Sequence, residues 1–206
     1  MLLMLGIVLL ASGLTGATQR ESAVVDSMFE SSTSTERHVA VLVTEGFQDA
    51  EAYMPIGYLA NRGVNITVIG PDTGRVKAYN SDFEIVIDKA VSDVTPDDFD
   101  ALIIPGGKAP AKLKEDPASV EFAKNFFNTG KLVAAICHGP QVLAAAGVLK
   151  GVTTTGVNSI QGELEAAGAK YLDQALVTDK NLITSRVPDD LPVFAEAIDK
   201  ALNSAR

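Results

Sequence analysis

Short, continuous apolar segments alternate with helical segments from residue 38 onward. The segments 39–43, 101–104 and 132–136 are apolar at consecutive positions, which is typical of strands buried on both faces. Such strands need helices on both sides of the sheet. The alternation therefore predicts an α/β fold with a parallel sheet covered on both faces.

The remaining elements follow from periodicity and from turn residues. Strands are expected at 64–69, 83–88, 175–178 and 182–185, and helices at 48–62, 117–129, 159–167 and from the Asp189-Asp190 cap to about Leu202. In parallel sheets, ligands bind at the carboxyl ends of the strands. Three strand ends lead to chemically suggestive segments, which are Gly46–Glu51, Gly106-Gly107 and Cys137-His138. These segments define the candidate site.

The composition excludes several classes of protein. The chain has 206 residues, a net charge of −9 and no basic cluster, which argues against nucleic acid as a partner. One cysteine excludes an internal disulfide and a multi-cysteine metal site, and two histidines argue against a histidine-rich one. No metal and no cofactor are expected.

The first seventeen residues carry no charge and resemble a secretory signal peptide, although the basic start of such a peptide is missing. A short membrane anchor and a wrongly assigned start near Met28 are the alternatives. Residues 1–36 are therefore interpreted as a leader with a flexible linker, and residues 37–206 as one domain. If residues 1–17 are a genuine leader, the protein is expected to be exported or periplasmic, and it contacts a membrane only through the leader, if the leader is retained. Without it, a cytoplasmic protein is expected.

Cys137 lies where the apolar segment 132–136 gives way to a helix, and His138 and Gly139 follow it. Free cysteine is often simply a small buried hydrophobe. A core residue, however, needs neither a sharp strand-to-helix turn nor an adjacent glycine. Such a turn exposes a nucleophile at the edge of a sheet, and the helix N-terminus favours the thiolate. Cys137 is therefore predicted to be a nucleophile.

Four further groups are candidates for the same site. Glu51 could exchange a hydrogen bond with the thiol if burial raises its pKa, or could simply complement a helix N-terminus. His138 could act as a base or stabilise a thiolate, although direct contact with Cys137 does not follow from their adjacency. The backbone N–H groups of Gly106, Gly107 and His138 could form an oxyanion hole. Arg186 could bind an anionic substrate or pair with a nearby aspartate.

Together these segments resemble the ThiJ/PfpI family over about residues 38–202. The resemblance rests on G-F-Q-D-A-E, F-D-A-L-I-I-P-G-G, A-I-C-H-G-P-Q-V-L and T-S-R-V-P-D-D-L-P, in that order. It implies a flavodoxin-like three-layer sandwich with a mainly parallel sheet, and a homodimer or larger homo-oligomer. It also implies Cys137 as nucleophile, Glu51 as its carboxyl partner, His138 as the neighbouring histidine, and Gly107 and His138 as donors to the oxyanion.

The sequence departs from the family pattern at three positions. Gln48 replaces the first glutamate of the G-F-E-D-x-E motif, and Val157 stands where some members carry a tyrosine. Ala111 stands where peptidase-like members place a glutamate from a neighbouring subunit to orient the histidine, and Glu115 or Asp116 could substitute. Gln48, Val157 and Arg186 are retained as candidate substrate-binding positions. A histidine without its acid is a weaker base, which disfavours peptidase activity.

Three functions remain open on this evidence. The first is a cofactor-free, stress-protective enzyme of the glyoxalase or deglycase type, acting on methylglyoxal, glyoxal or glycated protein through Cys137. The second is a cysteine peptidase or amidase that uses Cys137 and His138. The third is a redox sensor or chaperone, in which Cys137 is oxidised to the sulfinic acid.

Overall fold

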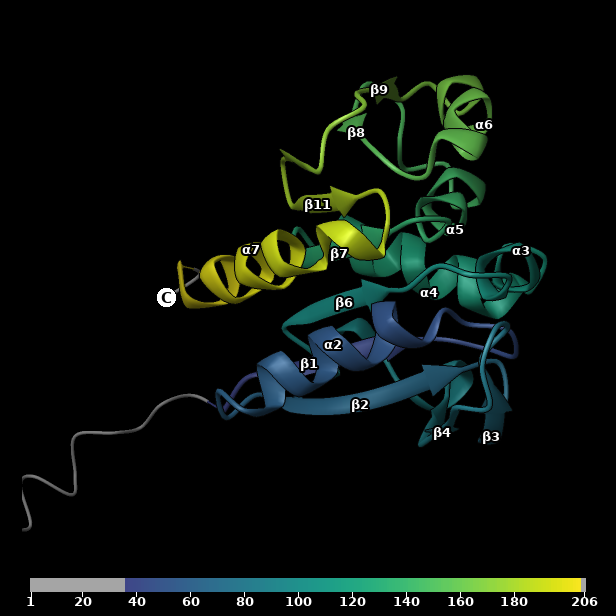
Figure 1. Cartoon of the computed structure of the whole chain (residues 1–206), viewed down its shortest axis with the longest axis vertical. Helices are drawn as coiled ribbons and strands as arrows, with labels where there is room; N and C mark the ends of the chain where they lie inside the picture. Colours follow the sequence, from purple (N-terminus) through teal and green to yellow (C-terminus); the bar gives the residue numbers. More distant parts are fainter. Residues whose placement is uncertain (1–35, 205–206) are drawn as a thin grey trace, which may run out of the picture. The chain divides into compact units, whose positions relative to one another are not determined.

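The computed structural model describes residues 36–204, which form a three-layer α/β sandwich around a seven-stranded sheet (Figure 1). The spatial order is β10-β11-β7-β6-β1-β2-β5, and every neighbouring pair is parallel except β10 and β11. The strands are β1 (His38–Leu42), β2 (Asn65–Gly70), β5 (Lys89–Ala90), β6 (Ala101–Ile104), β7 (Leu132–Ile136), β10 (Leu176–Asp179) and β11 (Leu182–Ser185). The predicted mainly parallel, flavodoxin-like architecture is confirmed.

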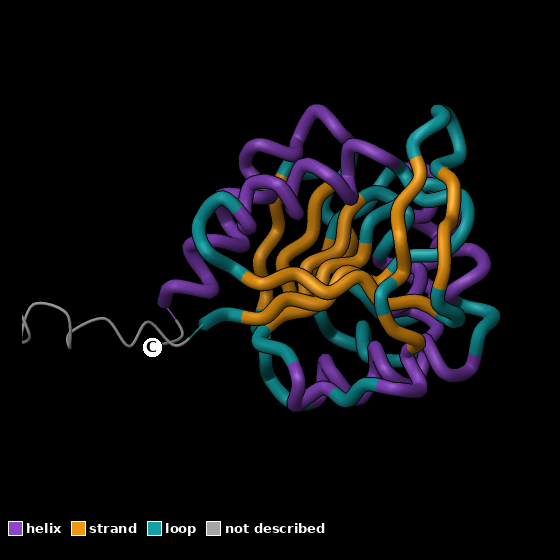
Figure 2. Tube along the Cα trace, turned by 90° about the horizontal axis from the view of Figure 1, so that it is seen from below, coloured by secondary structure: helices purple, strands orange, loops and turns teal. Residues whose placement is uncertain are grey.

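Helices cover both faces of this sheet, as the view in Figure 2 shows. They are α2 (Asp49–Ala60), α3 (Ala109–Leu113), α4 (Pro117–Asn128), α5 (Pro140–Ala145), α6 (Gln161–Ala166) and α7 (Leu191–Ser204). The predicted helix 159–167 is a 3₁₀ turn at Asn158–Ile160 followed by α6. The predicted aspartate cap of the last helix is instead a 3₁₀ turn, Pro188–Asp190, that leads into α7.

Successive residues of the central strands enter two different cores, as expected for strands that are buried on both faces. In β6, Ile103 packs into the core formed with α2 and α7, whereas Leu102 and Ile104 pack into the core formed with α4, α5 and α6. Leu59 and Phe194 are fully buried in the first core, and Phe126 in the second. The continuous apolar pattern of these strands reflects this double burial.

The predicted strand 83–88 lies outside the central sheet. It forms β4 (Glu84–Ile87), which pairs antiparallel with β3 (Gly74–Lys77) in a hairpin of its own. β3 was not predicted from the sequence, because its residues, G-R-V-K, include only one large apolar side chain. Two short strands, β8 (Thr153–Thr154) and β9 (Lys170–Tyr171), form another small sheet and were also missed.

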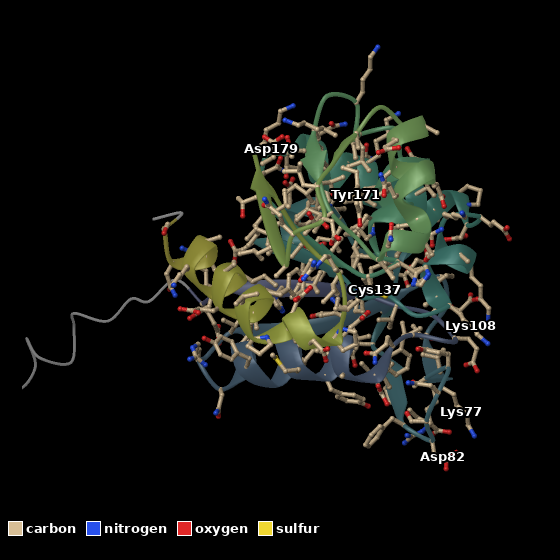
Figure 3. The ribbon with its side chains drawn as sticks, turned by 45° about the horizontal axis from the view of Figure 1, so that its top comes forward. Lys77, Asp82, Lys108, Cys137, Tyr171 and Asp179 are labelled. Atoms are coloured by element: carbon tan, nitrogen blue, oxygen red, sulfur yellow. The ribbon has the colours of Figure 1, made fainter. Side chains whose placement is uncertain are left out.

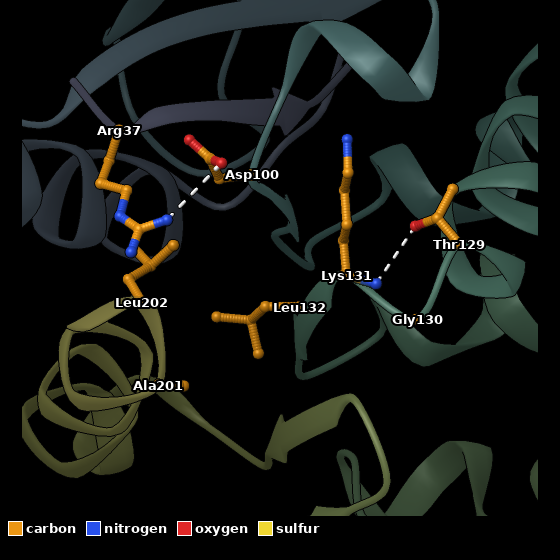
Figure 4. A pocket seen from close by; sticks show the side chains of 8 residues that line it. All are labelled: Arg37, Asp100, Thr129, Gly130, Lys131, Leu132, Ala201 and Leu202. Carbon is orange, nitrogen blue, oxygen red and sulfur yellow. Dashed lines mark hydrogen bonds and ion pairs between the residues drawn. The ribbon is translucent and has the colours of Figure 1, made fainter. Parts of the chain in front are cut away.

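A cavity of about 310 Å³ lies at the amino ends of the strands (Figure 4). Leu132, the first residue of β7, lines this cavity, whereas Cys137 follows the last residue of β7. The cavity therefore lies at the opposite end of the sheet from the thiol. Nη1 of Arg37 lies 3.7 Å from Oδ1 of Asp100, and Nζ of Lys131 donates to the carbonyl oxygens of Pro96 and Phe99. No candidate site residue lines this cavity.

Within residues 36–204, no helix is long and apolar enough to span a bilayer. The predicted leader and most of the linker, residues 1–35, lie outside the described residues. The interpretations that depend on them, including export and anchoring, stay predictions.

Candidate active site

Cys137 directly follows β7 and adopts a left-handed backbone conformation, with φ of +60°. This conformation is costly for a non-glycine residue, by ~1–2 kcal/mol, so the surrounding structure must enforce it. The N–H of Cys137 donates to the carbonyl of Ser185, and its own carbonyl accepts from the N–H of Val157. A Cβ at Gly139 would lie 2.2 Å from the carbonyl oxygen of Ile104, so only glycine fits there. The predicted sharp turn between strand and helix is therefore present.

His138 is in direct contact with the thiol, which its adjacency alone did not establish. Nδ1 of His138 lies 3.2 Å from Sγ of Cys137. Burial lowers the pKa of His138 below its usual value, and the carboxylate of Glu163 works against this shift. The imidazole is consequently neutral at pH 7, and a neutral imidazole can accept the proton of the thiol.

Glu51 in the first turn of α2 is fully buried beside Cys137. Its Oε2 accepts a hydrogen bond of 2.8 Å from the N–H of Gly106, and Oε1 has no hydrogen-bond partner within residues 36–204 by the usual distance criteria. Burial raises the pKa of Glu51 to about 7, although the N–H of Gly106 and the neighbouring thiol of Cys137 oppose the rise. Both protonation states of this carboxyl are therefore populated near neutral pH.

The thiol itself is protonated at neutral pH, contrary to the prediction that the helix N-terminus favours the thiolate. Burial raises the pKa of Cys137 to about 12, and the negative charge of Glu51 adds to the rise. The N–H groups of Gly107 and His138 act in the opposite direction but do not outweigh burial. This sulfur therefore becomes a thiolate at neutral pH only if its proton passes to a neighbouring base.

The two glycines after β6 serve different purposes. A Cβ at Gly106 would lie 2.6 Å from both Cβ of Cys137 and Oε2 of Glu51, so glycine permits these groups to approach. The N–H of Gly106 is occupied by Glu51, which corrects its predicted place in the oxyanion hole. Gly107 has φ of +83°, and its N–H and that of His138 face the sulfur. These two amides are the donors available to a developing oxyanion.

The thiol opens into a cavity of about 430 Å³, and Figure 3 shows Cys137 with Lys108 on the same side of the molecule. The cavity is lined by Tyr79, Gly107, Lys108, Ala111, Cys137, His138 and Gln141. Nζ of Lys108 lies 5.8 Å from the centre of the Tyr79 ring. Tyr79, Lys108 and Gln141 were not predicted as lining residues, although Gln141 lies within the A-I-C-H-G-P-Q-V-L segment.

Glu163 is a further residue near the site that was not predicted from the sequence. Its Oε2 accepts from Nε2 of Gln141 at 2.6 Å, and its Oε1 accepts from Nζ of Lys114 at 2.8 Å. Partial burial disfavours its ionisation, but these two hydrogen bonds prevail and lower its pKa. Glu163 is thus an ionised carboxylate whose charge acts on His138.

The three candidate substrate-binding positions lie outside this cavity. Oε1 of Gln48 accepts from the N–H of Glu51 at 2.6 Å, so Gln48 caps α2. Arg186 forms ion pairs with Asp190 at 2.9 Å and with Asp173 at 2.7 Å. Pairing with an aspartate was the alternative to the anion-binding role expected for this side chain. The side chain of Val157 packs against residues of both cores, and its N–H donates a hydrogen bond to the carbonyl oxygen of Cys137.

The two positions named as substitutes for the family glutamate, Glu115 and Asp116, do not line the Cys137 cavity of their own chain. Ala111 is exposed and lines the cavity of its own chain. Asp116 caps α4 by accepting from the N–H of Ser119, and Glu115 is exposed outside the cavity lining. In residues 36–204, no group of three or more His, Cys, Asp or Glu side chains is arranged to hold a metal ion.

Known proteins are similar to this chain over nearly all of the described residues. The family model "DJ-1/PfpI family" matches residues 37–201. The chain is 42% identical over 160 residues to "Protein/nucleic acid deglycase 2" of Escherichia coli, covering 77% of this chain and 93% of that protein. It is 44% identical over 158 residues to YraA of Bacillus subtilis, whose name carries a provisional assignment as a cysteine protease, covering 77% and 94%.

A solved structure shares the fold as well. It is a two-domain protein from Anabaena variabilis with DJ-1/ThiJ/PfpI-like and ferritin-like domains, with a TM-score of 0.80 and 39% identity. The match covers 82% of this chain and 48% of that longer one. With the cysteine turn, the buried glutamate and the sheet order already described, these matches show that the chain belongs to the DJ-1/PfpI family.

Proposed function

We propose that this protein is a cysteine-dependent enzyme that acts on reactive dicarbonyls and on their early adducts with protein side chains. The observation that carries the proposal is the buried carboxyl of Glu51 beside the thiol of Cys137, with its pKa raised to about 7. A carboxyl with this pKa can both remove and return a proton near neutral pH. The deglycase name of the Escherichia coli relative supports the same class of chemistry.

The first step is addition of the sulfur to an aldehyde carbon. Sγ of Cys137 bonds to the aldehyde carbon of methylglyoxal, and the thiol proton passes to Nδ1 of His138, 3.2 Å away, or to Glu51. The carbonyl oxygen becomes an oxyanion that the N–H groups of Gly107 and His138 stabilise. The oxyanion then takes up a proton and gives a hemithioacetal.

The second step moves a proton between adjacent carbons. Ionised Glu51 removes the hydrogen of the sulfur-bearing carbon to give an enediol, and a proton is returned to the neighbouring carbon. The product is a thioester of a 2-hydroxy acid. Water hydrolyses the thioester, which releases lactate and restores the thiol. The overall reaction adds one water to methylglyoxal and needs no oxidant or reductant.

An early adduct on a lysine enters the same sequence. The sulfur attacks the carbon that carries the amine and the hydroxyl, the carbon–nitrogen bond breaks, and the amine leaves with a proton. The lysine is restored and the same hemithioacetal is formed on Cys137. Rearrangement and hydrolysis follow as before.

Peptide or amide hydrolysis is the second candidate. It is favoured by the contact between His138 and Cys137, by the carboxylate of Glu163 acting on the imidazole, and by the protease assignment in the name of YraA. The absence of a glutamate at Ala111 argues against it. Hydrolysis of peptide reporters that is lost in His138→Ala, with little turnover of dicarbonyls, would favour this candidate.

The deciding experiment measures lactate formed from methylglyoxal by the full chain without added glutathione, beside Cys137→Ser. We expect turnover by the wild type that disappears in the serine variant and falls steeply in Glu51→Gln. Wild-type turnover no higher than that of Cys137→Ser, with the protein folded, would refute the proposal.

A further inference from the structure

Gln141, in the first turn of α5, lines the Cys137 cavity with an amide that is paired on one side only. The residue is 8% exposed, and its Nε2 donates to Oε2 of Glu163 at 2.6 Å. Within residues 36–204, Oε1 of Gln141 accepts no hydrogen bond, yet it is not among the unpaired polar atoms that are sealed from solvent. The carbonyl oxygen of this nearly buried amide is therefore available to a ligand in the cavity.

Glu163 determines which end of the amide is available. Its carboxylate also accepts from Nζ of Lys114 at 2.8 Å, and an ionised carboxylate can only accept hydrogen bonds. The amide nitrogen of Gln141, which can only donate, must therefore face Glu163. Rotation of the amide by half a turn would place two oxygens against each other. Gln141 consequently offers the cavity an acceptor and not a donor.

This acceptor lies one turn along the chain from the reacting thiol. The N–H of Gln141 donates to the carbonyl of His138 at 3.0 Å, and both side chains line the cavity. Nδ1 of His138 lies 3.2 Å from Sγ of Cys137. The N–H groups of Gly107 and His138 face the same sulfur. A molecule in this cavity therefore meets two backbone donors and one side-chain acceptor.

The substrates of the proposed reaction differ in whether they can use such an acceptor. Methylglyoxal has two carbonyl oxygens and no N–H or O–H group. Its early adduct with an amine carries a hydroxyl and an N–H on the carbon that the sulfur attacks. When the carbon–nitrogen bond breaks, the thiol proton ends on the amine nitrogen, whose N–H groups become stronger donors as the nitrogen gains positive charge. An acceptor beside this nitrogen therefore favours the transition state over the bound substrate.

We propose that Oε1 of Gln141 accepts a hydrogen bond from the amine N–H of the early adduct, and that Glu163 holds the amide in the orientation that permits it. Gln141 is then a specificity-determining residue that favours adducts of amines over the free dicarbonyl, and Glu163 is a positioning residue. This inference rests on the proposed function and specifies the substrate class of the same site.

Binding can be tested without turnover in Cys137→Ser. The probes are N-methyllactamide and methyl lactate, which differ only in an N–H that replaces the ester oxygen. We expect N-methyllactamide to bind about fivefold more tightly, the usual effect of one hydrogen bond, and to shift the side-chain amide signals of Gln141 in NMR spectra. Adding Gln141→Met, which keeps the length of the side chain without its acceptor, should remove this preference. Adding Gln161→Met should keep it, because Gln161 pairs with Glu165 at 2.9 Å but lies outside the cavity lining.

Exchanging the two side chains distinguishes hydrogen bonding from packing. When Gln141→Glu is combined with Glu163→Gln, the amide nitrogen at position 163 donates to one carboxylate oxygen at position 141, and the other oxygen is again an acceptor. The preference for N-methyllactamide should return in this double variant. Glu163→Gln alone should weaken the preference, because either end of the Gln141 amide can then face position 163.

Two binding results would overturn the inference. The first is a ratio of the two affinities that is the same with Gln141→Met as with Gln161→Met. The second is side-chain amide signals of Gln141 that do not move at the highest soluble concentration of N-methyllactamide. Either result would show that Gln141 only connects α5 with α6 through Glu163.

Turnover separates this inference from the proposed function. The substrates are methylglyoxal and its adduct with Nα-acetyl-lysine, for which only amine release faster than spontaneous dissociation is counted. The ratio of kcat/KM for the adduct to kcat/KM for methylglyoxal should fall about fivefold in Gln141→Met and stay the same in Gln161→Met. If the wild type processes both substrates and the ratio is equal in the two variants, the inference fails and the function stands. If the wild type processes neither, the function fails, and the binding titration still decides whether Gln141 accepts from an N–H group.

Discussion

Oε2 of Glu51 accepts a hydrogen bond of 2.8 Å from the backbone N–H of Gly106, which holds the carboxyl fully buried against the thiol of Cys137. The bond joins the first turn of α2 to the end of β6, so the position of the carboxyl is determined by the sheet. A carboxyl held in this way can exchange a proton with the thiol and with a substrate bonded to it.

Replacing Glu51 by glutamine should reduce turnover of methylglyoxal by ~10²–10⁴-fold, the usual effect of losing a general acid–base group. Glutamine has nearly the same shape and can still accept from Gly106, so the fold should be retained. Initial rates of lactate formation and a circular dichroism spectrum check the two halves of this prediction. A loss of less than threefold would exclude Glu51 as the proton-transfer group.

The same substitution should change how stability depends on pH. The pKa of Glu51 is raised from an ordinary 4.5 to about 7, so the folded state binds more protons than the unfolded state between these two values. The wild type therefore loses stability as pH rises from 4.5 to 7, by ~3 kcal/mol for a shift of this size. Below pH 4 the carboxyl is neutral in both states, and the loss is absent.

Glu51→Gln lacks this titration. Its free energy of unfolding should exceed that of the wild type at pH 8 and match it at pH 4, as measured by urea denaturation. Parallel pH profiles for the two proteins would contradict the raised pKa of Glu51.

Glu163 should act on the reaction through His138. Its negative charge raises the pKa of the imidazole against the lowering effect of burial. Glu163→Gln should therefore move the acidic limb of the kcat/KM profile that belongs to His138 to lower pH, and reduce turnover by less than about tenfold. Glu165→Gln, on the same helix, is the matched control, because Glu165 bonds only to Gln161 among the described side chains. An unchanged pH profile in Glu163→Gln would show that the carboxylate serves only to connect α3, α5 and α6.

Gly106→Ala should abolish activity and destabilise the protein. Its Cβ would lie 2.6 Å from both Cβ of Cys137 and Oε2 of Glu51, and 2.8 Å from the N–H nitrogen of His138, so the site must open. Forced overpacking of this kind costs ~1–3 kcal/mol. Thermal melts and lactate formation measure both effects.

Gly57→Ala in α2 is the control for this variant. A Cβ there meets no atom within 4 Å, and alanine in a helix interior is favoured over glycine by ~1 kcal/mol. It should raise the melting temperature and leave turnover intact. Equal behaviour of the two alanine variants would mean that the close packing around Gly106 does not matter.

Local pattern alone predicted much of the fold and the central feature of the site. Strands buried on both faces are recognisable because consecutive apolar residues, such as 101–104, have to face two cores. The turn at Cys137 is recognisable because an apolar strand, a cysteine and a glycine follow one another directly. These features depend on residues that are adjacent in the chain. The short polar strand β3 carries no such pattern, and it forms only because β4 pairs with it.

The chemistry of the site was decided by tertiary structure. The prediction of a thiolate at Cys137 considered only the helix that follows, whereas burial and Glu51, brought from another part of the chain, raise the pKa of the thiol instead. The predicted oxyanion role of Gly106 failed for a similar reason, because Glu51 occupies its N–H. Desolvation and pairing depend on which distant residues meet in the fold. The sequence by itself therefore determined the sheet and the sharp turn that carries Cys137, and only the tertiary structure decided which groups surround its thiol.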